Sequence, residues 1–286
     1  MKRFESVHIL AWAILALSVF TCLIWYTALR EDRHAKLTVS FLDIGQGDSI
    51  YIESPTGMQV LIDGGPDTQV LRRLSDVMPW YDRSIDLIIP THPDADHVSG
   101  LVDVLSRYQA SYVLQSSVLG DTTVWNVLEK AIVKEGSTNL IARRGRIIDI
   151  GGGAYLEILA PDREVRNLET NTACVVAKLV YGKTAFMLTC DAPQAIEKYL
   201  VELDGTALKS NVLKAGHHGS KNSSSPLFIG YVDPQYVVYS RGCKNRYGHP
   251  NGETVATFAR FGLVASDTCK EGTITFVSDG AKVVRQ

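Results

Sequence analysis

The sequence predicts an α/β protein in which two mixed β-sheets pack face to face with helices on their outer surfaces, preceded by one transmembrane helix. The sheets are predicted because short apolar runs alternate with amphipathic runs in the order strand–strand, then strand–helix. The same order returns in the second half of the chain, as two similar half-domains would require. The membrane helix is predicted because residues 7–29 contain no Asp, Glu, Lys or Arg.

The N-terminal apolar segment, Val7 to Leu29, is long enough to cross a bilayer as a helix. A cleaved signal peptide is the competing interpretation, but Tyr26-Thr27-Ala28-Leu29 is a poor cleavage site and the apolar region is long. We therefore expect residues 1–36 to form a retained membrane anchor with a short linker, and residues 37–286 to form one globular domain. Basic residues flank both ends of the segment, so its charges leave the orientation open.

Composition sets the class of protein. The chain has 286 residues, of which 45% are hydrophobic, and this suits one large domain with a short appendage. A net charge of −2 gives no overall electrostatic reason to bind nucleic acid, although a local basic groove remains open. The five cysteines include no C-x-x-C pair, so they predict neither a zinc finger nor a disulfide framework.

The order of elements follows from periodicity and turn residues. Three strands over residues 37–42, 49–53 and 58–62 read as an antiparallel meander, because short Gly or Pro turns separate them. Gly151-Gly152-Gly153 predicts a hairpin turn. We expect further strands over residues 85–89, 112–115, 141–150, 155–159, 173–181, 185–189, 211–214, 236–239, 273–277 and 281–284. Helices are expected over residues 68–78, 96–108, 122–134, 193–203 and 252–261.

The densest group of ligand-type side chains follows the strand at residues 85–89. His92, Asp94, Asp96 and His97 lie within six residues, where that strand ends and a helix begins. Each offers a lone pair to a cation, and Asp96 is expected near the helix N-cap. Ordinary capping of a polar loop is the alternative, but four such side chains in six positions favour a metal site.

Two other apolar strands end in the same way, in Asp191 and in His217. An Asp after a strand is often only a helix cap, and a loop His often only packs. Strands that finish at one edge of a sheet nevertheless bring such side chains together. Asp48 and Asp63 follow earlier strands, and we expect their short side chains to bond loop N–H groups.

The H-x-D-x-D-H stretch resembles the H-x-H-x-D-H signature of metallo-β-lactamase-fold hydrolases, with Asp94 replacing the second histidine. This replacement is the form found in the hydrolase domain of the ComEC/Rec2 competence proteins. The other matching stretches are Phe41 to Ser49, Leu61 to Gly65, Leu188 to Asp191, Lys214 to Lys221 and Asn245 to Pro250. Together they cover nearly all of the chain beyond the first helix.

The resemblance implies an αββα sandwich with two divalent metal ions, zinc or manganese. It assigns His92, Asp94 and Asp191 to one ion, and Asp96, His97, Asp191 and His217 to the other, with Asp63 bracing the metal loop. Asp96, Asp191 and His249 are the implied catalytic residues. There are two departures: Asn171 lies where many family members supply a further His, and Cys190 replaces a usual Gly.

Polar loops beside these residues offer hydrogen-bond donors to phosphate oxygens. The candidate substrate-binding residues are Asn171, His218, Ser220, Lys221, Arg246 and His249. A solvated loop explains the individual Lys and Ser residues equally well. His249 matches the family loop more closely, and it is a candidate proton donor, phosphate contact or replacement ligand.

The resemblance implies a metal-dependent phosphodiesterase, plausibly a DNase of ComEC type anchored in the membrane with its hydrolase domain outside the cytoplasm. With one apolar span in place of the many-helix channel of such transporters, the chain would act beside a separate channel protein or on another substrate entirely. Three alternatives stay open: a cell-surface phosphodiesterase on a small headgroup such as phosphorylcholine, a lactamase- or thioesterase-like hydrolase, and a non-catalytic binding domain. Asp94 argues against the lactamase because β-lactamases keep a nitrogen-rich first site.

Overall fold

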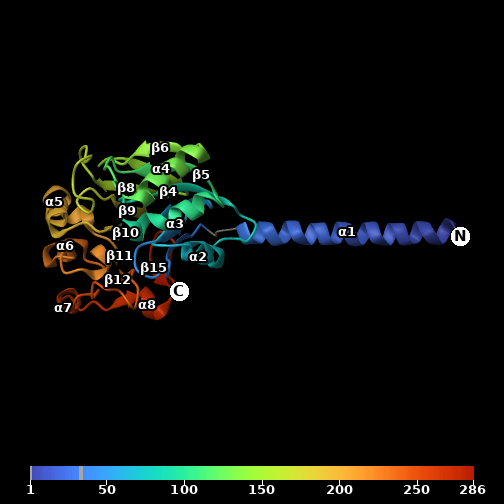
Figure 1. Ribbon diagram of the computed structural model, residues 1–286. Helices are drawn as coiled ribbons and strands as arrows, with labels where there is room; N and C mark the ends of the chain where they lie inside the picture. Colours follow the sequence, from blue (N-terminus) through green and yellow to red (C-terminus); the bar gives the residue numbers. More distant parts are fainter. Residues whose placement is uncertain (1, 32–34) are drawn as a thin grey trace. The chain divides into compact units, whose positions relative to one another are not determined.

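The computed structural model describes residues 2–31 and 35–286 and divides into two compact units, Met1–Ala35 and Lys36–Gln286 (Figure 1). The first unit is helix α1 (Lys2–Glu31). Its stretch His8–Tyr26 has a mean hydropathy of 2.2 over 19 residues, which is long and apolar enough to cross a membrane. A signal sequence would meet the same criterion.

The second unit contains two mixed sheets. The eight-stranded sheet has the order β15-β14-β1-β2-β3-β4-β5-β6 and the seven-stranded sheet the order β13-β12-β11-β10-β9-β8-β7. The first sheet comprises β1 (Leu37–Phe41), β2 (Ile50–Glu53), β3 (Gln59–Ile62), β4 (Ser84–Ile89), β5 (Gln109–Gln115), β6 (Thr138–Ile141), β14 (Ile274–Ser278) and β15 (Val283–Arg285). The second comprises β7 (Ile147–Gly151), β8 (Ala154–Ala160), β9 (Val176–Tyr181), β10 (Thr184–Leu188), β11 (Val212–Lys214), β12 (Tyr236–Tyr239) and β13 (Ala265–Asp267).

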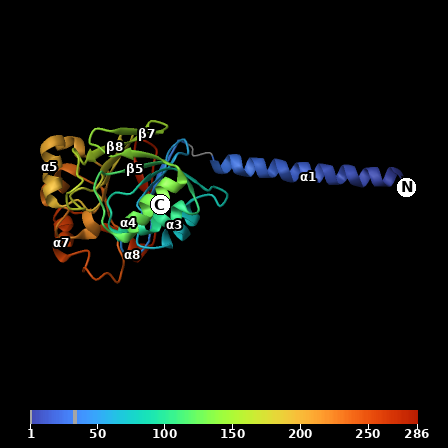
Figure 2. The same ribbon diagram turned by 45° about the horizontal axis from the view of Figure 1, so that its top comes forward.

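Helices cover the outer face of each sheet. Figure 2 shows α3 and α4 on one side of the domain and α5 and α7 on the other. On the first sheet lie α2 (Gln69–Val77), α3 (Ala95–Leu105) and α4 (Thr123–Glu135); on the second lie α5 (Gln194–Asp204), α6 (Pro226–Val232) and α7 (Gly252–Arg260). A third apolar core fills the space between the sheets. The predicted αββα sandwich is confirmed.

Strand direction places the ligand-type side chains together. In the first sheet β3, β4, β5 and β6 run parallel, and in the second β10, β11, β12 and β13 do so. The carboxyl ends of parallel strands share an edge, where α/β folds hold their sites. The loops after β4, β10, β11 and β12 carry the metal-site candidates and His249.

Two expectations about elements are wrong. Residues 141–150 do not form one strand: β6 ends at Ile141 and β7 begins at Ile147 in the other sheet, and the polar turn between them holds Gly145 at φ +82°. Helix α6 was missed, although Ser225 caps it by accepting a hydrogen bond from the Phe228 N–H and Pro226 occupies its first turn.

One disulfide joins Cys243 to Cys269, whose Cα atoms lie 5.0 Å apart. The sequence did not predict this pair, because 26 residues separate the two cysteines and only the adjacency of β12 and β13 brings them together. The bond ties the loop after β12 to the short helix α8 (Thr268–Glu271). Cys22, Cys174 and Cys190 are free thiols.

Candidate metal centre

Asp63 braces the loop that follows β4. Its Oδ1 accepts a hydrogen bond from the Thr91 N–H at 2.8 Å, and its Oδ2 accepts one from the Thr91 hydroxyl at 2.7 Å. The same carboxylate lies 2.8 Å from His97 Nδ1. The His97 ring is therefore held with Nε2 pointing away from Asp63, in the role that the family resemblance implies for this aspartate.

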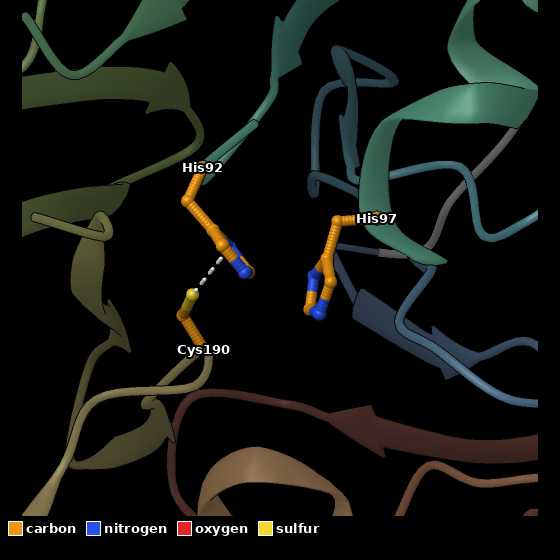
Figure 3. Close-up of side chains that lie close together, drawn as sticks. All are labelled: His92, His97 and Cys190. Carbon is orange, nitrogen blue, oxygen red and sulfur yellow. Dashed lines mark hydrogen bonds between the residues drawn. The ribbon is translucent and has the colours of Figure 1, made fainter. Parts of the chain in front are cut away.

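The H-x-D-x-D-H stretch turns from the end of β4 into α3. The N-cap of α3 is Asp94, and Asp96 lies in the first turn, so Asp96 is near the N-cap as expected. His92 Nε2 is 3.6 Å from Asp94 Oδ2, and the rings of His92 and His97 lie 4.1 Å apart between centroids. Figure 3 shows these two rings side by side.

Asp191 lies at the centre of the cluster. Its Oδ2 is 3.3 Å from Nε2 of His97 and 3.3 Å from Nε2 of His218. It is also 3.5 Å from Nε2 of His217. One carboxylate oxygen thus lies within 3.5 Å of three imidazoles from two loops, the one after β4 and the one after β11.

The two adjacent histidines in the loop after β11 have positions that differ from the roles predicted from the sequence. His218 is buried; its Nδ1 lies 2.9 Å from the Ser240 carbonyl oxygen, and its Nε2 lies 3.5 Å from Asp96 Oδ2. His217 is 30% exposed and touches the cluster through Asp191. The geometry therefore makes His218 a ligand candidate, although the sequence placed it on the substrate side and His217 on the metal.

The ring nitrogens show that these residues fit a metal. Among the residues that the structure describes, Nε2 of His92, His97 and His218 is buried without a hydrogen-bond partner. In each ring Nδ1 is engaged by Thr91, Asp63 or Ser240. Metal-ligating histidines have this arrangement, with one nitrogen oriented by the protein and the other left for the ion. The close-packed candidate sets are His92–His97–Cys190, Asp96–His97–His218, Asp48–Asp63–His97 and Asp48–Asp191–His218.

Sequence reasoning missed a buried ion pair behind the cluster. Lys214, fully buried at the end of β11, pairs with Asp48 and donates a hydrogen bond to the Cys190 carbonyl at 2.8 Å. Its Nζ is 3.4 Å from Asp191 Oδ1. Asp48 was expected only to bond loop N–H groups, but its Oδ1 lies 3.3 Å from His218 Nδ1. The sequence feature that could have indicated this ion pair is a lysine at the end of an apolar strand, close to two histidines.

Charges in the cluster compensate one another. Burial alone would raise the pKa of the Asp191 carboxyl, but His218, His97 and Lys214 hold that pKa well below its usual range. Burial alone would likewise lower the pKa of His218, but Asp191 and Asp48 raise it well above its usual value. Asp191 is therefore ionised and available as a ligand at neutral pH.

Cys190 lies beside His92, as Figure 3 shows. Its Sγ is 3.3 Å from His92 Nδ1 and within 3.2 Å of the Thr91 hydroxyl oxygen. Burial raises the pKa of this thiol well above its usual value, so the thiol is protonated. Its backbone φ of +51° is the left-handed conformation that a glycine adopts at lower cost.

The candidate substrate-binding residues differ in their burial and in their contacts. The His249 ring lies 5.5 Å from that of His217, and burial together with repulsion from His217 and His218 lowers the pKa of His249 to about 4. Asn171 has a buried Oδ1 without a hydrogen-bond partner in the described chain. Arg246 is exposed and stacks on Tyr247 at 5.0 Å. Ser220 is buried and accepts a hydrogen bond from the Asn222 N–H, whereas Lys221 is exposed.

The fold and the histidine–aspartate cluster together define a metallo-β-lactamase-type centre. The chain belongs to the metallo-β-lactamase superfamily, whose family model matches residues 42–240. It is thus a member of a superfamily of hydrolases that generally bind divalent metals.

Competence proteins are among its relatives. The chain is 27% identical to ComE operon protein 3 of Bacillus subtilis, with 83% of this chain and 32% of that protein aligned. It is 28% identical to competence protein ComA of Neisseria gonorrhoeae, with 93% and 35% aligned. Recombination protein 2 of Haemophilus influenzae is 26% identical, with 91% and 32% aligned. The chain spans about a third of the length of these relatives.

Solved structures share the fold at low sequence identity. The diiron β-hydroxylase CmlA of Streptomyces venezuelae has a TM-score of 0.55 and 12% identity, covering 87% of this chain and 54% of that one. The metallo-β-lactamase fold protein YhfI of Bacillus subtilis has a TM-score of 0.53 and 11% identity, covering 80% and 95%. At such identities the likeness concerns the fold alone.

Proposed function

We propose that the chain is a membrane-anchored, metal-dependent phosphodiesterase, plausibly a DNase. One observation carries the proposal: buried, unpartnered Nε2 atoms of three histidines converge with the carboxylates of Asp96 and Asp191. Such a set needs cations to be satisfied, because an unpaired buried polar atom costs about 1–3 kcal/mol.

Two divalent ions, zinc or manganese, are proposed for this set. His92, Asp94 and Asp191 would hold one ion; Asp96, His97 and Asp191, with His218 or His217, would hold the other. When bound, such a pair supplies a nucleophilic hydroxide and neutralises charge on a phosphoryl oxygen. Three carboxylates make the site oxygen-rich, which suits manganese as well as zinc.

The neighbouring loops would recognise the phosphodiester. Arg246, Lys221 and the Ser220 loop offer donors to anionic oxygen, and Asn171 has a buried acceptor without a hydrogen-bond partner among the described residues. His249 is neutral at pH 7 because its pKa is about 4, so we propose that its ring contacts the phosphate or the leaving oxygen as a neutral donor. A polymeric substrate such as DNA suits the competence relatives.

The domain is proposed to lie outside the cytoplasm, beside a separate channel protein. The Cys243–Cys269 disulfide supports this placement, because disulfides persist in oxidising compartments and are rare in the cytosol. The competence relatives and the apolar helix are in line with membrane association.

The test is hydrolysis by the full chain, with manganese or zinc, of DNA, bis-p-nitrophenyl phosphate, a phosphorylcholine ester and nitrocefin side by side. We expect turnover of the phosphodiesters and none of nitrocefin. Lys221→Ala with Arg246→Ala should weaken DNA binding and flatten its salt dependence without changing metal content. The control variant, Lys198→Ala with Arg260→Ala, removes the same charge elsewhere and should change neither DNA binding nor its salt dependence. Faster hydrolysis of nitrocefin than of any phosphodiester would contradict the proposal.

A further inference from the structure

The edge of the first sheet opposite the metal centre forms a distinct surface. Strands β3, β4 and β5 run parallel and carry the metal loop at their carboxyl ends, so their amino ends lie at the other edge. Strand β1 begins at this edge too, because it pairs antiparallel to β2, which pairs antiparallel to β3. The chain therefore enters the domain, at Lys36, on the side away from the metal centre.

A basic groove lies along α2 and the end of α3 toward this edge. It has a volume of about 760 Å³ and adjoins a second hollow of about 480 Å³; both are lined by Arg83, Arg107 and Tyr108. Arg72 lines the larger hollow. Glu135 lines the smaller one and is the one carboxylate among the lining residues of the two.

The groove arginines are available to an anion. All three are exposed, and within the described ranges none has an ion-pair partner. Arg83 is pre-oriented: its guanidinium donates to the Tyr108 hydroxyl at 3.2 Å and lies 5.5 Å from the centre of that ring. Guanidinium groups favour phosphate because their planar donors match two phosphate oxygens.

An exposed aromatic residue lies three positions before Arg83 in the chain. Trp80 is 76% exposed in the turn between α2 and β4, with its ring 5.7 Å from that of Tyr81. Tryptophan side chains are enriched where proteins meet the interfacial region of a bilayer.

The tether limits which side of the domain can face a membrane. From Tyr26, the end of the apolar stretch, helix α1 continues for five residues to Glu31, about 8 Å at 1.5 Å per residue. Residues 32–36 add at most about 18 Å when fully extended. The sum of about 26 Å is well below the diameter of about 46 Å expected for a 251-residue domain. If α1 spans the bilayer, Lys36 stays within about 26 Å of it, which is too short for the opposite edge, with the metal centre, to lie against the bilayer.

We propose that the groove of Arg72, Arg83 and Arg107, together with Trp80, docks on anionic phospholipid headgroups. Docking would hold the metal centre facing away from the bilayer and open to a long substrate. This inference rests on the proposed membrane anchor and not on the proposed chemistry. The groove lies at the edge opposite the metal centre, so it is a separate binding site for a different phosphate.

The test uses the full chain in nanodiscs of phosphatidylcholine alone or of phosphatidylcholine with phosphatidylglycerol, and follows hydrogen exchange. Anionic discs should protect residues 78–84 and 105–109, and high salt should abolish the protection. Arg72→Gln with Arg83→Gln and Arg107→Gln should lower the docking equilibrium about a hundredfold, from the effect of three basic residues at an anionic surface. Trp80→Ser should weaken docking without changing net charge.

The matched control is Lys130→Gln with Lys198→Gln and Arg260→Gln, which removes three charges from α4, α5 and α7 and should dock normally. Equal exchange in both kinds of disc would overturn the proposal. So would protection of the same residues by DNA in phosphatidylcholine discs, which would assign the groove to nucleic acid. Hydrolysis of bis-p-nitrophenyl phosphate, measured in the same discs, reports separately on the metal centre.

Discussion

Among the described residues, each histidine of the buried cluster has one ring nitrogen held by the protein and a second, Nε2, that has no hydrogen-bond partner. Asp63 fixes His97 and Ser240 fixes His218, and Asp191 lies 3.3 Å from the second nitrogen of both. Asp191 is also the residue that the proposal assigns to both ions.

Asp191→Asn keeps the shape of the side chain but removes the charge that two cations would share. We expect loss of both ions and a fall in hydrolysis of more than about a hundredfold, beyond what removing an outer-sphere partner costs. Metal analysis and steady-state kinetics measure both effects. Asp121→Asn, at an exposed site, should behave as wild type. Two ions retained per chain in the Asp191 variant would show that this residue is not shared.

Residue types predicted the cluster, but not which neighbour fills which place. His217 and His218 are adjacent, and only their left-handed backbone, with φ values of 47° and 56°, decides that the second ring is buried against Asp96. Asp48 and Lys214 lie far apart in the sequence, so their pairing depends on how the two sheets pack. Neither the burial of the second ring nor this pairing can be predicted from the local sequence pattern.

At the scale of elements, helix α5 anchors the loop that follows the two histidines. Glu197 on α5 is buried and accepts hydrogen bonds from the N–H groups of Ser224 and Ser225. Burial, only partly opposed by these bonds, raises the pKa of Glu197 to about 7. The loop therefore depends on a carboxyl group that titrates near neutral pH.

Because the folded pKa of Glu197 exceeds its ordinary value of 4.5, the folded protein binds more protons than the unfolded chain between about pH 4.5 and 7. This group should lower the free energy of unfolding as pH rises through that window, by about 3 kcal/mol in total. Glu197→Gln should remove that slope and cost about 1 kcal/mol at pH 5 for one weakened hydrogen bond. Urea unfolding at pH 5 and pH 7.5 compares the two proteins. Identical slopes would rule out ionisation of Glu197 in this range.

The Cys243–Cys269 disulfide restrains the loop that presents His249. Within this loop Asn245 accepts from the His249 N–H at 2.9 Å and donates to the His249 carbonyl at 2.8 Å. Cys243→Ser with Cys269→Ser should lower the free energy of unfolding by about 3.5 kcal/mol, the entropy of closing a loop of this length. Urea unfolding measures the loss. Alkylation of the unreduced, denatured wild type should label three thiols, and labelling of all five would disprove the bond.

At the scale of the whole molecule, the order of elements and the edge that carries the site followed from sequence, because hydrophobic periodicity and strand-end positions are local. The prediction of one strand over residues 141–150 was wrong because the apolar residues on the two sides of a turn resemble a single apolar run in the sequence. The disulfide and the basic groove could not be predicted, since each joins segments that meet only in the folded domain.

The N-terminal helix should remain part of the protein. Its apolar stretch of 19 residues and its lack of a good cleavage site predict that protein extracted from membranes still contains residues 1–30. Intact mass spectrometry measures this. A mature N-terminus near Arg30 would instead show a cleaved signal peptide, and would also remove the tether on which docking depends.

The most direct measurement is a metal titration of the full chain after its metals have been stripped by a chelator, with hydrolysis of bis-p-nitrophenyl phosphate followed at each step. The account predicts no hydrolysis without metal and a rise that levels off at two manganese or zinc ions per chain, because the proposed ligand sets hold two ions and share Asp191. Hydrolysis by the stripped protein at the same rate, or no phosphodiester hydrolysis with two ions bound, would contradict it.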